Sequence, residues 1–127
     1  MPVAYTITWE PHGVCRNFTG VATGKDLLDG QKILHGDSRY YDTKYEILDF
    51  LEATDCTITS VDAENHLANH IGAATTVRKR VVGVVATHPR IIALAEGYGT
   101  HPASPQPLKL FSTVEDARAW IAGSRKS

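Results

Sequence analysis

One apolar run near the middle of the chain most constrains the fold. Residues 81–86 read Val-Val-Gly-Val-Val-Ala, with no polar or charged side chain among them. A short run of this kind, rich in β-branched residues, is typical of a central strand in a parallel sheet, where both faces are buried. We therefore predict a buried strand from Val81 to Thr87.

The segments around this run alternate between strand and helix patterns. Alternating side chains over residues 5–9 and 14–19, joined by a turn at 10–13, predict a β-hairpin. Further strands are predicted over 45–51 and 108–111, and helices over 25–35, 60–77, 89–99 and 113–122, with loops over 37–43, 52–59 and 100–107 and a frayed tail from 123. Strands that alternate with helices imply right-handed crossovers. The fold class is therefore α/β, with an N-terminal hairpin followed by mostly parallel βαβ units.

Length and composition indicate one globular domain. The chain has 127 residues, of which 43% are hydrophobic and 21% charged. These fractions are ordinary for a globular protein. We expect a single domain over residues 1–127, with an ordered core of about 3–122. The formal net charge of −1 gives no electrostatic reason to expect a nucleic-acid partner.

No segment suggests a membrane span or a secretory signal. The longest apolar run is far shorter than the ~20 residues that cross a bilayer. Met1 and Pro2 lead directly into an alternating segment, without a basic head and an apolar middle. We therefore expect a cytoplasmic protein that is not an integral membrane protein. Cys15 and Cys56 match no metal or redox spacing, and two buried free thiols are expected rather than a disulfide.

Several segments resemble the SpoIIAA-like family, which is related to STAS domains and has been compared with lipid-binding SEC14 domains. The resemblance lies in the opening hairpin, the strands 45–50 and 80–85, and most specifically the ending Phe-Ser-Thr-Val-Glu-Asp-Ala-Arg-Ala-Trp-Ile at 111–121. It implies a SpoIIAA/STAS-like strand–helix superhelix. STAS antagonists are switched by phosphorylation within an Asp-Ser-Ser-Gly type motif. The stretch 55–62 has hydroxyl residues but no such motif, so the resemblance does not carry a phosphorylation switch over to this chain.

Polar residues that follow the parallel strands form the candidate binding site. Ligands of open parallel sheets bind beyond the carboxyl ends of the strands, where helix N-termini offer free N–H groups. The candidate ligand-binding residues are Thr57, Thr59, Ser60, Thr87, His88 and Arg90. Plain helix capping is the competing interpretation, because Ser and Thr are common at helix starts.

Other candidate sites are weaker. His66 and His70 share a helix face and have a spacing that can hold a metal, but exposed histidines without a metal are the expectation. The Arg78-Lys79-Arg80 run is expected to complement a helix C-terminus. Asp49 is either an acid with a raised pKa or an acceptor of backbone hydrogen bonds. The Arg39-Tyr40-Tyr41 segment is either a binding lip or an ordinary packed loop, and Cys56 lacks a neighbouring histidine that could activate it as a nucleophile.

Two functional hypotheses from different classes remain. The favoured one is a non-enzymatic binding or regulatory module without a cofactor, which acts through protein contacts, including those of a homodimer, or captures a small polar or acyl ligand. The alternative is a small enzyme that uses the same strand edge, with His88 or Asp49 as acid or base. The first is favoured because no pair of titratable groups converges with motif-like spacing.

Overall fold

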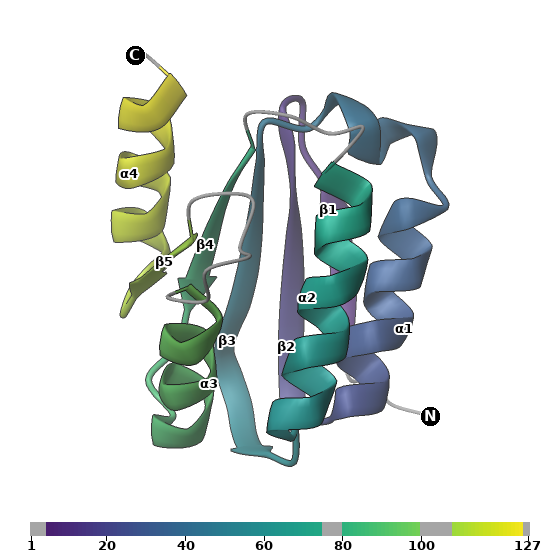
Figure 1. The fold of residues 1–127 in the computed structure, drawn as a ribbon. Coiled ribbons are helices and arrows are strands. Elements are labelled where there is room, and N and C mark those ends of the chain that lie inside the picture. Colours follow the sequence, from purple (N-terminus) through teal and green to yellow (C-terminus); the bar gives the residue numbers. More distant parts are fainter. Residues whose placement is uncertain (1–4, 75–79, 100–107, 126–127) are drawn as a thin grey trace.

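A single mixed sheet forms the centre of the protein. The computed structural model describes residues 5–74, 80–99 and 108–125 (Figure 1). Within these ranges the strands are β1 (Tyr5–Trp9), β2 (Gly13–Ala22), β3 (Tyr45–Cys56), β4 (Val81–Val85) and β5 (Leu108–Phe111), and they lie in the sheet in the order of the chain. The first strand runs antiparallel to the second, and all other neighbours are parallel. The predicted hairpin followed by parallel βαβ units is confirmed.

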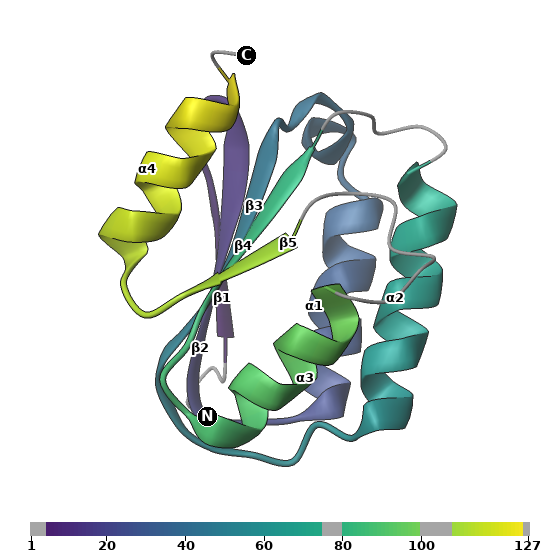
Figure 2. The same ribbon diagram turned by 60° about the vertical axis from the view of Figure 1, so that its left-hand side comes forward.

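Helices cover both faces of this sheet. The helices α1 (Gly24–His35), α2 (Ser60–Ala74) and α3 (Pro89–Gly99) lie on one face, and α4 (Val114–Arg125) lies on the other (Figure 2). A short 3₁₀ helix, η1 (Ser38–Asp42), connects α1 to β3. Among the described residues, none of the helices is long and apolar enough to cross a membrane.

The alternation of side chains along β3 divides the core into two parts. Leu48 and Phe50 point to the face with α1–α3, whereas Ile47 packs against α4. Successive residues of a strand point to opposite faces, so a strand with apolar residues at successive positions needs cover on both sides. The continuous apolar patterns in the sequence thus required the three-layer arrangement.

The helix starts follow the predicted capping chemistry. The Thr23 hydroxyl accepts a hydrogen bond from the Asp26 N–H, and the Thr113 hydroxyl accepts one from the Asp116 N–H. Such side-chain acceptors satisfy amide groups that have no partner within the helix. The first and last helices therefore begin within one residue of the predicted positions.

Several predicted boundaries are wrong, among them the ends of the strands predicted over 14–19 and 81–87, which the structure places at Ala22 and Val85. The strand predicted over residues 45–51 continues to Cys56, because β2 itself extends to Ala22 and pairs with it along this length. Residues 52–56, Glu-Ala-Thr-Asp-Cys, show no strand pattern by themselves, and pairing with β2 makes them extended. At the other end, α4 continues to Arg125, although the sequence predicts a frayed tail from residue 123.

The two cysteines lie in separate parts of the core. Both are buried and free, as predicted. Cys15 packs on the α4 side of the sheet and Cys56 on the opposite side. Burial raises the pKa of the Cys15 thiol to about 11, so this thiol stays protonated and unreactive at neutral pH.

An ion pair joins the β1–β2 turn to α4. The Arg118 guanidinium donates two hydrogen bonds to Glu10, from Nη2 to Oε2 at 2.7 Å and from Nη1 to Oε1 at 3.0 Å. The Tyr45 hydroxyl donates to the same carboxylate. Hydrogen bonds from Arg118 lower the pKa of Glu10 below its ordinary value of 4.5.

This pair predicts a measurable pH dependence of stability. Because the folded-state pKa of Glu10 is depressed, its contribution is complete above the unfolded-state pKa and disappears as the pH falls through the folded-state value. We expect Glu10→Gln to lower the free energy of unfolding at neutral pH by about 1 kcal/mol or less, since Arg118 is 46% exposed. Urea unfolding at a series of pH values should show the difference vanishing in acid. The exposed Glu52→Gln is the control, and a difference for Glu10→Gln that persists at low pH would contradict the assignment.

Candidate functional site

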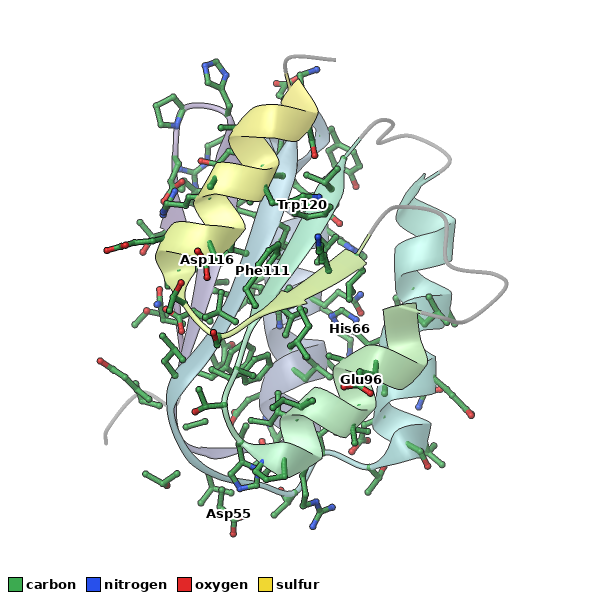
Figure 3. The ribbon with its side chains drawn as sticks, turned by 90° about the vertical axis from the view of Figure 1, so that its left-hand side faces the viewer. Asp55, His66, Glu96, Phe111, Asp116 and Trp120 are labelled. Carbon is green, nitrogen blue, oxygen red and sulfur yellow. The ribbon has the colours of Figure 1, made fainter. Side chains whose placement is uncertain are left out.

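The predicted ligand-binding residues lie at one edge of the sheet. The residues after β3 and those after β4 lie at the same edge because these strands are parallel. The exposed members are Thr57, Thr59, Ser60, Thr87 and Arg90, and His88 is half-buried. Figure 3 shows Asp55 from the same edge at the lower end of the molecule, well away from His66.

Helix capping occupies several polar atoms of this edge. The Thr59 hydroxyl accepts a hydrogen bond from the Asp62 N–H, and the Asp62 carboxylate accepts one from the Thr59 N–H. His88 Nδ1 accepts a hydrogen bond from the Arg90 N–H at 3.2 Å. The first turns of α2 and α3 are thus stabilised from within, as the capping interpretation expects.

One side-chain pair at the edge joins the two loops. His88 Nε2 lies 3.8 Å from the Asp55 Oδ1 atom. Since His88 Nδ1 is the acceptor for Arg90, the ring proton of a neutral His88 belongs on Nε2, facing Asp55. Asp49, the other candidate acid, is not part of this group. It accepts hydrogen bonds from the Leu51 N–H and from Asn17, and its position in β3 places it on the α4 side.

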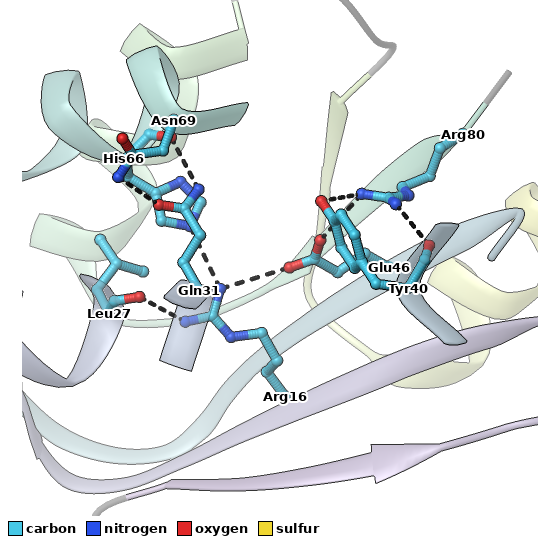
Figure 4. A network of polar contacts seen from close by, with 8 residues as sticks. All are labelled: Arg16, Leu27, Gln31, Tyr40, Glu46, His66, Asn69 and Arg80. Carbon is cyan, nitrogen blue, oxygen red and sulfur yellow. Dashed lines mark hydrogen bonds and ion pairs between the residues drawn. The ribbon is translucent and has the colours of Figure 1, made fainter. Parts of the chain in front are cut away.

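A buried ionic cluster lies deeper, between the sheet and the helices. Glu46 stands between two fully buried arginines, with Oε2 3.4 Å from Arg16 Nη1 and Oε1 3.7 Å from Arg80 Nη1 (Figure 4). Both distances exceed the roughly 2.7–2.9 Å of a well-formed charge-assisted hydrogen bond. The carboxylate therefore retains acceptor capacity that its arginine partners do not use fully.

Backbone and aromatic groups hold the two arginines in place. Arg16 Nη2 donates to the Leu27 carbonyl at 2.7 Å. Arg80 Nη2 donates to the Tyr40 carbonyl at 3.0 Å, and its guanidinium lies over the Tyr40 ring with Cζ 3.7 Å from the centroid. Burial raises the pKa of Tyr40 to about 12, so the phenol is neutral. Two guanidinium groups and one carboxylate leave the cluster with one excess positive charge.

His66 connects this cluster to α2. Its Nε2 lies 3.3 Å from Arg16 Nη1. A guanidinium only donates hydrogen bonds, so His66 Nε2 is the acceptor in this contact, which puts the ring proton of a neutral His66 on Nδ1. The His66 carbonyl accepts a hydrogen bond from Gln31, whose own carbonyl accepts one from Asn69 (Figure 4). These hydrogen bonds join Gln31 on α1 to His66 and Asn69 on α2, and His66 in turn contacts Arg16.

A small cavity adjoins the cluster under α2 and α3. Its volume is about 70 Å³, and its wall is apolar except for Glu46 and His66. A second hollow of about 240 Å³ lies between α2 and α3. Ala63 and Leu94 line both spaces, so the two hollows are neighbours. The inner cavity therefore places a small, mostly apolar space beside the buried Glu46 carboxylate.

Two expectations about histidine and arginine are wrong. The sequence predicts an exposed His66, but this side chain is buried because it accepts a hydrogen bond from the buried Arg16. The sequence also predicts that Arg80 complements a helix end, but it is fully buried and pairs with Glu46. The side chain of His70 and residues 78–79 lie outside the described part of the chain. Within that part, no group of three His, Cys, Asp or Glu side chains could hold a metal.

The segment Arg39-Tyr40-Tyr41 is largely used inside the fold. Tyr40 is buried under Arg80, and the Arg39 guanidinium pairs with Asp37 and lies 4.4 Å from the centroid of the Trp9 ring. Tyr41 stays partly exposed and donates to a backbone carbonyl of α1. The packed-loop interpretation accounts for these contacts.

The sequence reasoning missed Arg16 and Glu46. Each is a charged residue inside a predicted strand, Arg16 after Val14 and Cys15 and Glu46 before Ile47 and Leu48, and that was the available signal. An isolated charge in a strand does not reveal its partner, however. The pairing became visible only when the parallel register placed Arg16 beside Leu48 and turned Glu46 toward the same face.

Gly30 leaves room for Arg16, which gives a testable consequence. A Cβ atom at this position would lie 2.8 Å from Arg16 Nη2. Alanine favours a helix interior over glycine by about 1 kcal/mol, but overpacking a core costs about 1–3 kcal/mol. We expect Gly30→Ala to lower the free energy of unfolding, as measured in urea. In an Arg16→Met background the same change should become stabilising, and destabilisation in both backgrounds would contradict the steric explanation.

Comparisons with known proteins establish the fold. No protein-family model matches the sequence, and no curated protein matches it. Among solved structures, an uncharacterised DUF3478-family protein from Shewanella loihica PV-4 with a SpoIIAA-like fold is 15% identical, with a TM-score of 0.60, covering 93% of this chain and 92% of that one.

Two structures of SpoIIAA itself are similar. The unphosphorylated anti-sigma factor antagonist SpoIIAA is 9% identical with a TM-score of 0.63, and the match covers 94% of this chain and 99% of that one. The phosphorylated form of the Bacillus cell fate determinant SpoIIAA is 12% identical with a TM-score of 0.62, covering 93% and 99%. The chain therefore has a SpoIIAA-like fold.

Proposed function

We propose that this chain is a non-enzymatic regulatory module that contacts another protein through the carboxyl edge of its parallel strands. The observation that carries the proposal is the exposed edge itself. Val61, in the first turn of α2, is 62% exposed and follows the polar residues Thr59 and Ser60. In this proposal Val61 is the apolar centre of the contact surface and its polar neighbours are the rim, the arrangement found in protein interfaces.

The fold supports the same interpretation. The similar protein SpoIIAA is an anti-sigma factor antagonist, so its fold is compatible with regulation. At this edge, Thr87 and Arg90 add polar groups from the α3 side, while the hydroxyl and ring atoms of Thr59 and His88 already cap helices. Because these atoms already cap helices, the edge favours a protein contact over a substrate site.

The enzyme alternative has one observation in its favour. Asp55 lies beside His88 Nε2, an arrangement that can orient an imidazole base. The distance of 3.8 Å is longer than a hydrogen bond, and Asp55 is well exposed. Asp49 adds nothing to this pair, because it lies on the other face of the sheet. The contact function is therefore preferred.

Site-specific photocrosslinking tests the proposal. A photoreactive residue at Val61, in protein expressed in its native host, should yield a discrete crosslinked product, and Arg90→Glu should reduce its amount. The matched control is the same photoreactive residue at Ile33, which is 53% exposed on α1, away from the edge. A product at twice the mass of the chain would identify a second copy as the partner. Equal products from both positions, or none from Val61, would contradict the proposal.

A further inference from the structure

The first strand, β1, is an unprotected edge strand. Among the described strands it pairs with β2 on one side and has no neighbour on its outer side. An edge strand presents backbone N–H and C=O groups that can pair with another chain, and proteins usually block it with lysine, proline or a bulge. None of these occurs in β1, which reads Tyr-Thr-Ile-Thr-Trp and keeps a regular register with β2.

The strand at the other end of the described sheet is protected in the usual way. β5 has only four residues, and the exposed Lys109 lies within it. A short strand and a lysine both oppose pairing with a further strand. Of these two edge strands, β1 is therefore the one open to another chain.

The register of the hairpin shows which backbone groups of β1 point outward. The Glu10 N–H donates to the Gly13 carbonyl, and hydrogen-bonded pairs alternate with non-hydrogen-bonded pairs along an antiparallel ladder. The next pair along the ladder contains Trp9, so this pair is not hydrogen-bonded. The N–H and C=O groups of Tyr5, Ile7 and Trp9 therefore point away from β2.

The side chains of β1 fit a second copy of the same strand. In an antiparallel pairing centred on Ile7, Tyr5 of each copy lies opposite Trp9 of the other, and Thr6 lies opposite Thr8. The pairs formed by the residues with outward backbone groups can each exchange two hydrogen bonds. Aromatic pairs and threonine pairs are both favourable across antiparallel strands. The strand is thus complementary to itself.

The charges near β1 do not oppose this pairing. The strand itself has no charged side chain. At the end where the hairpin turns, the Arg39 guanidinium lies over an aromatic ring of β1 but pairs with Asp37. Near the other end, Lys25 on α1 pairs with Asp29. Two copies therefore meet without an uncompensated like charge.

We propose that two copies of this chain pair through β1, antiparallel and centred on Ile7, so that their two sheets become continuous. The inference goes beyond the protein-contact function, because it uses the outer side of β1 rather than the carboxyl edge of the parallel strands. One strand pair is small beside the roughly 800 Å² per partner of a standard interface. The dimer should therefore be weak, with a Kd of about 10–100 µM.

Sedimentation velocity of the whole chain over about 5–500 µM tests the dimer and its register. Thr6→Lys together with Thr8→Lys places like charges opposite each other across the pairing, which should weaken the dimer about tenfold or more. The matched control, Thr6→Glu together with Thr8→Lys, places opposite charges there and should dimerise at least as well as the original chain. A monomer at every concentration, or equal Kd values for the two variants, would overturn the proposal.

Amide hydrogen exchange gives a second readout that needs no variant. Raising the protein concentration through the Kd should slow exchange at the N–H groups of Tyr5, Ile7 and Trp9. The two threonines between them, whose N–H groups point to β2, should change much less. Absent or uniform concentration dependence would contradict pairing through β1. Neither test alters Val61 or Arg90, so the crosslinking test of the protein-contact function succeeds or fails independently.

Discussion

Replacing Glu46 with leucine should lower the free energy of unfolding by about 3–5 kcal/mol. The carboxylate is the shared partner of Arg16 and Arg80, and both guanidinium groups are fully buried. Removing one member of a buried ionic group leaves its partners charged, without water and without compensation, and this costs far more than the group contributes when intact. Urea unfolding monitored by circular dichroism measures the change.

Two controls separate charge from packing. Glu52→Leu, on the exposed end of the same strand, should change the free energy of unfolding by about 0.5 kcal/mol or less. The triple variant with Arg16→Met, Glu46→Leu and Arg80→Met should recover most of the lost stability, because no buried charge remains. A loss below about 1 kcal/mol for Glu46→Leu alone would show that the arginines find water or another partner.

Replacing Phe18 with alanine should also cost about 3–5 kcal/mol. Phe18 is 1% exposed and stacks on Phe50 of the neighbouring strand, with ring centroids 4.4 Å apart. The Arg16 guanidinium also lies over the Phe18 ring, with Cζ 5.3 Å from the ring centroid. Truncation removes the transfer free energy of the ring and leaves a cavity that the surrounding strands cannot close.

The size series provides the check on this prediction. Phe18→Leu should cost clearly less than Phe18→Ala, because it retains more of the buried volume. The matched control for loss of apolar surface is Ile33→Ala, on the exposed side of α1. This control should change stability by about 0.5 kcal/mol or less. Equal losses for the leucine and alanine variants in urea unfolding would contradict a packing origin.

The element types were predictable because their signals are local. A short β-branched run distinguishes a strand such as Val81–Val85 from a helix such as α1, whose apolar residues recur with the helical period. Residues such as Thr23 mark helix starts through hydrogen bonds within one turn. The extension of β3 to Cys56 was not predictable. It depends on pairing with β2, whose residues lie more than thirty positions earlier in the chain.

The same contrast between local signals and long-range contacts applies to the candidate sites. The edge residues Thr59 and His88 could be located from the sequence, because the carboxyl ends of neighbouring parallel strands meet at one edge. What these residues contact could not be predicted, and ligand binding at this edge stays a prediction. The buried cluster was missed because Arg16 lies in β2, Glu46 in β3 and Arg80 just before β4, and no local pattern links them.

The sequence by itself determined the order of strands and helices, the hairpin at the start and the need for helices on both faces of the sheet. These properties follow from periodicity and from the handedness of βαβ crossovers, which act over short stretches of chain. Only the tertiary structure decided that Glu46 joins two buried arginines and that His66 lies beside a cavity. Burial and charge pairing depend on which distant side chains meet, and that is set by sheet register and helix packing.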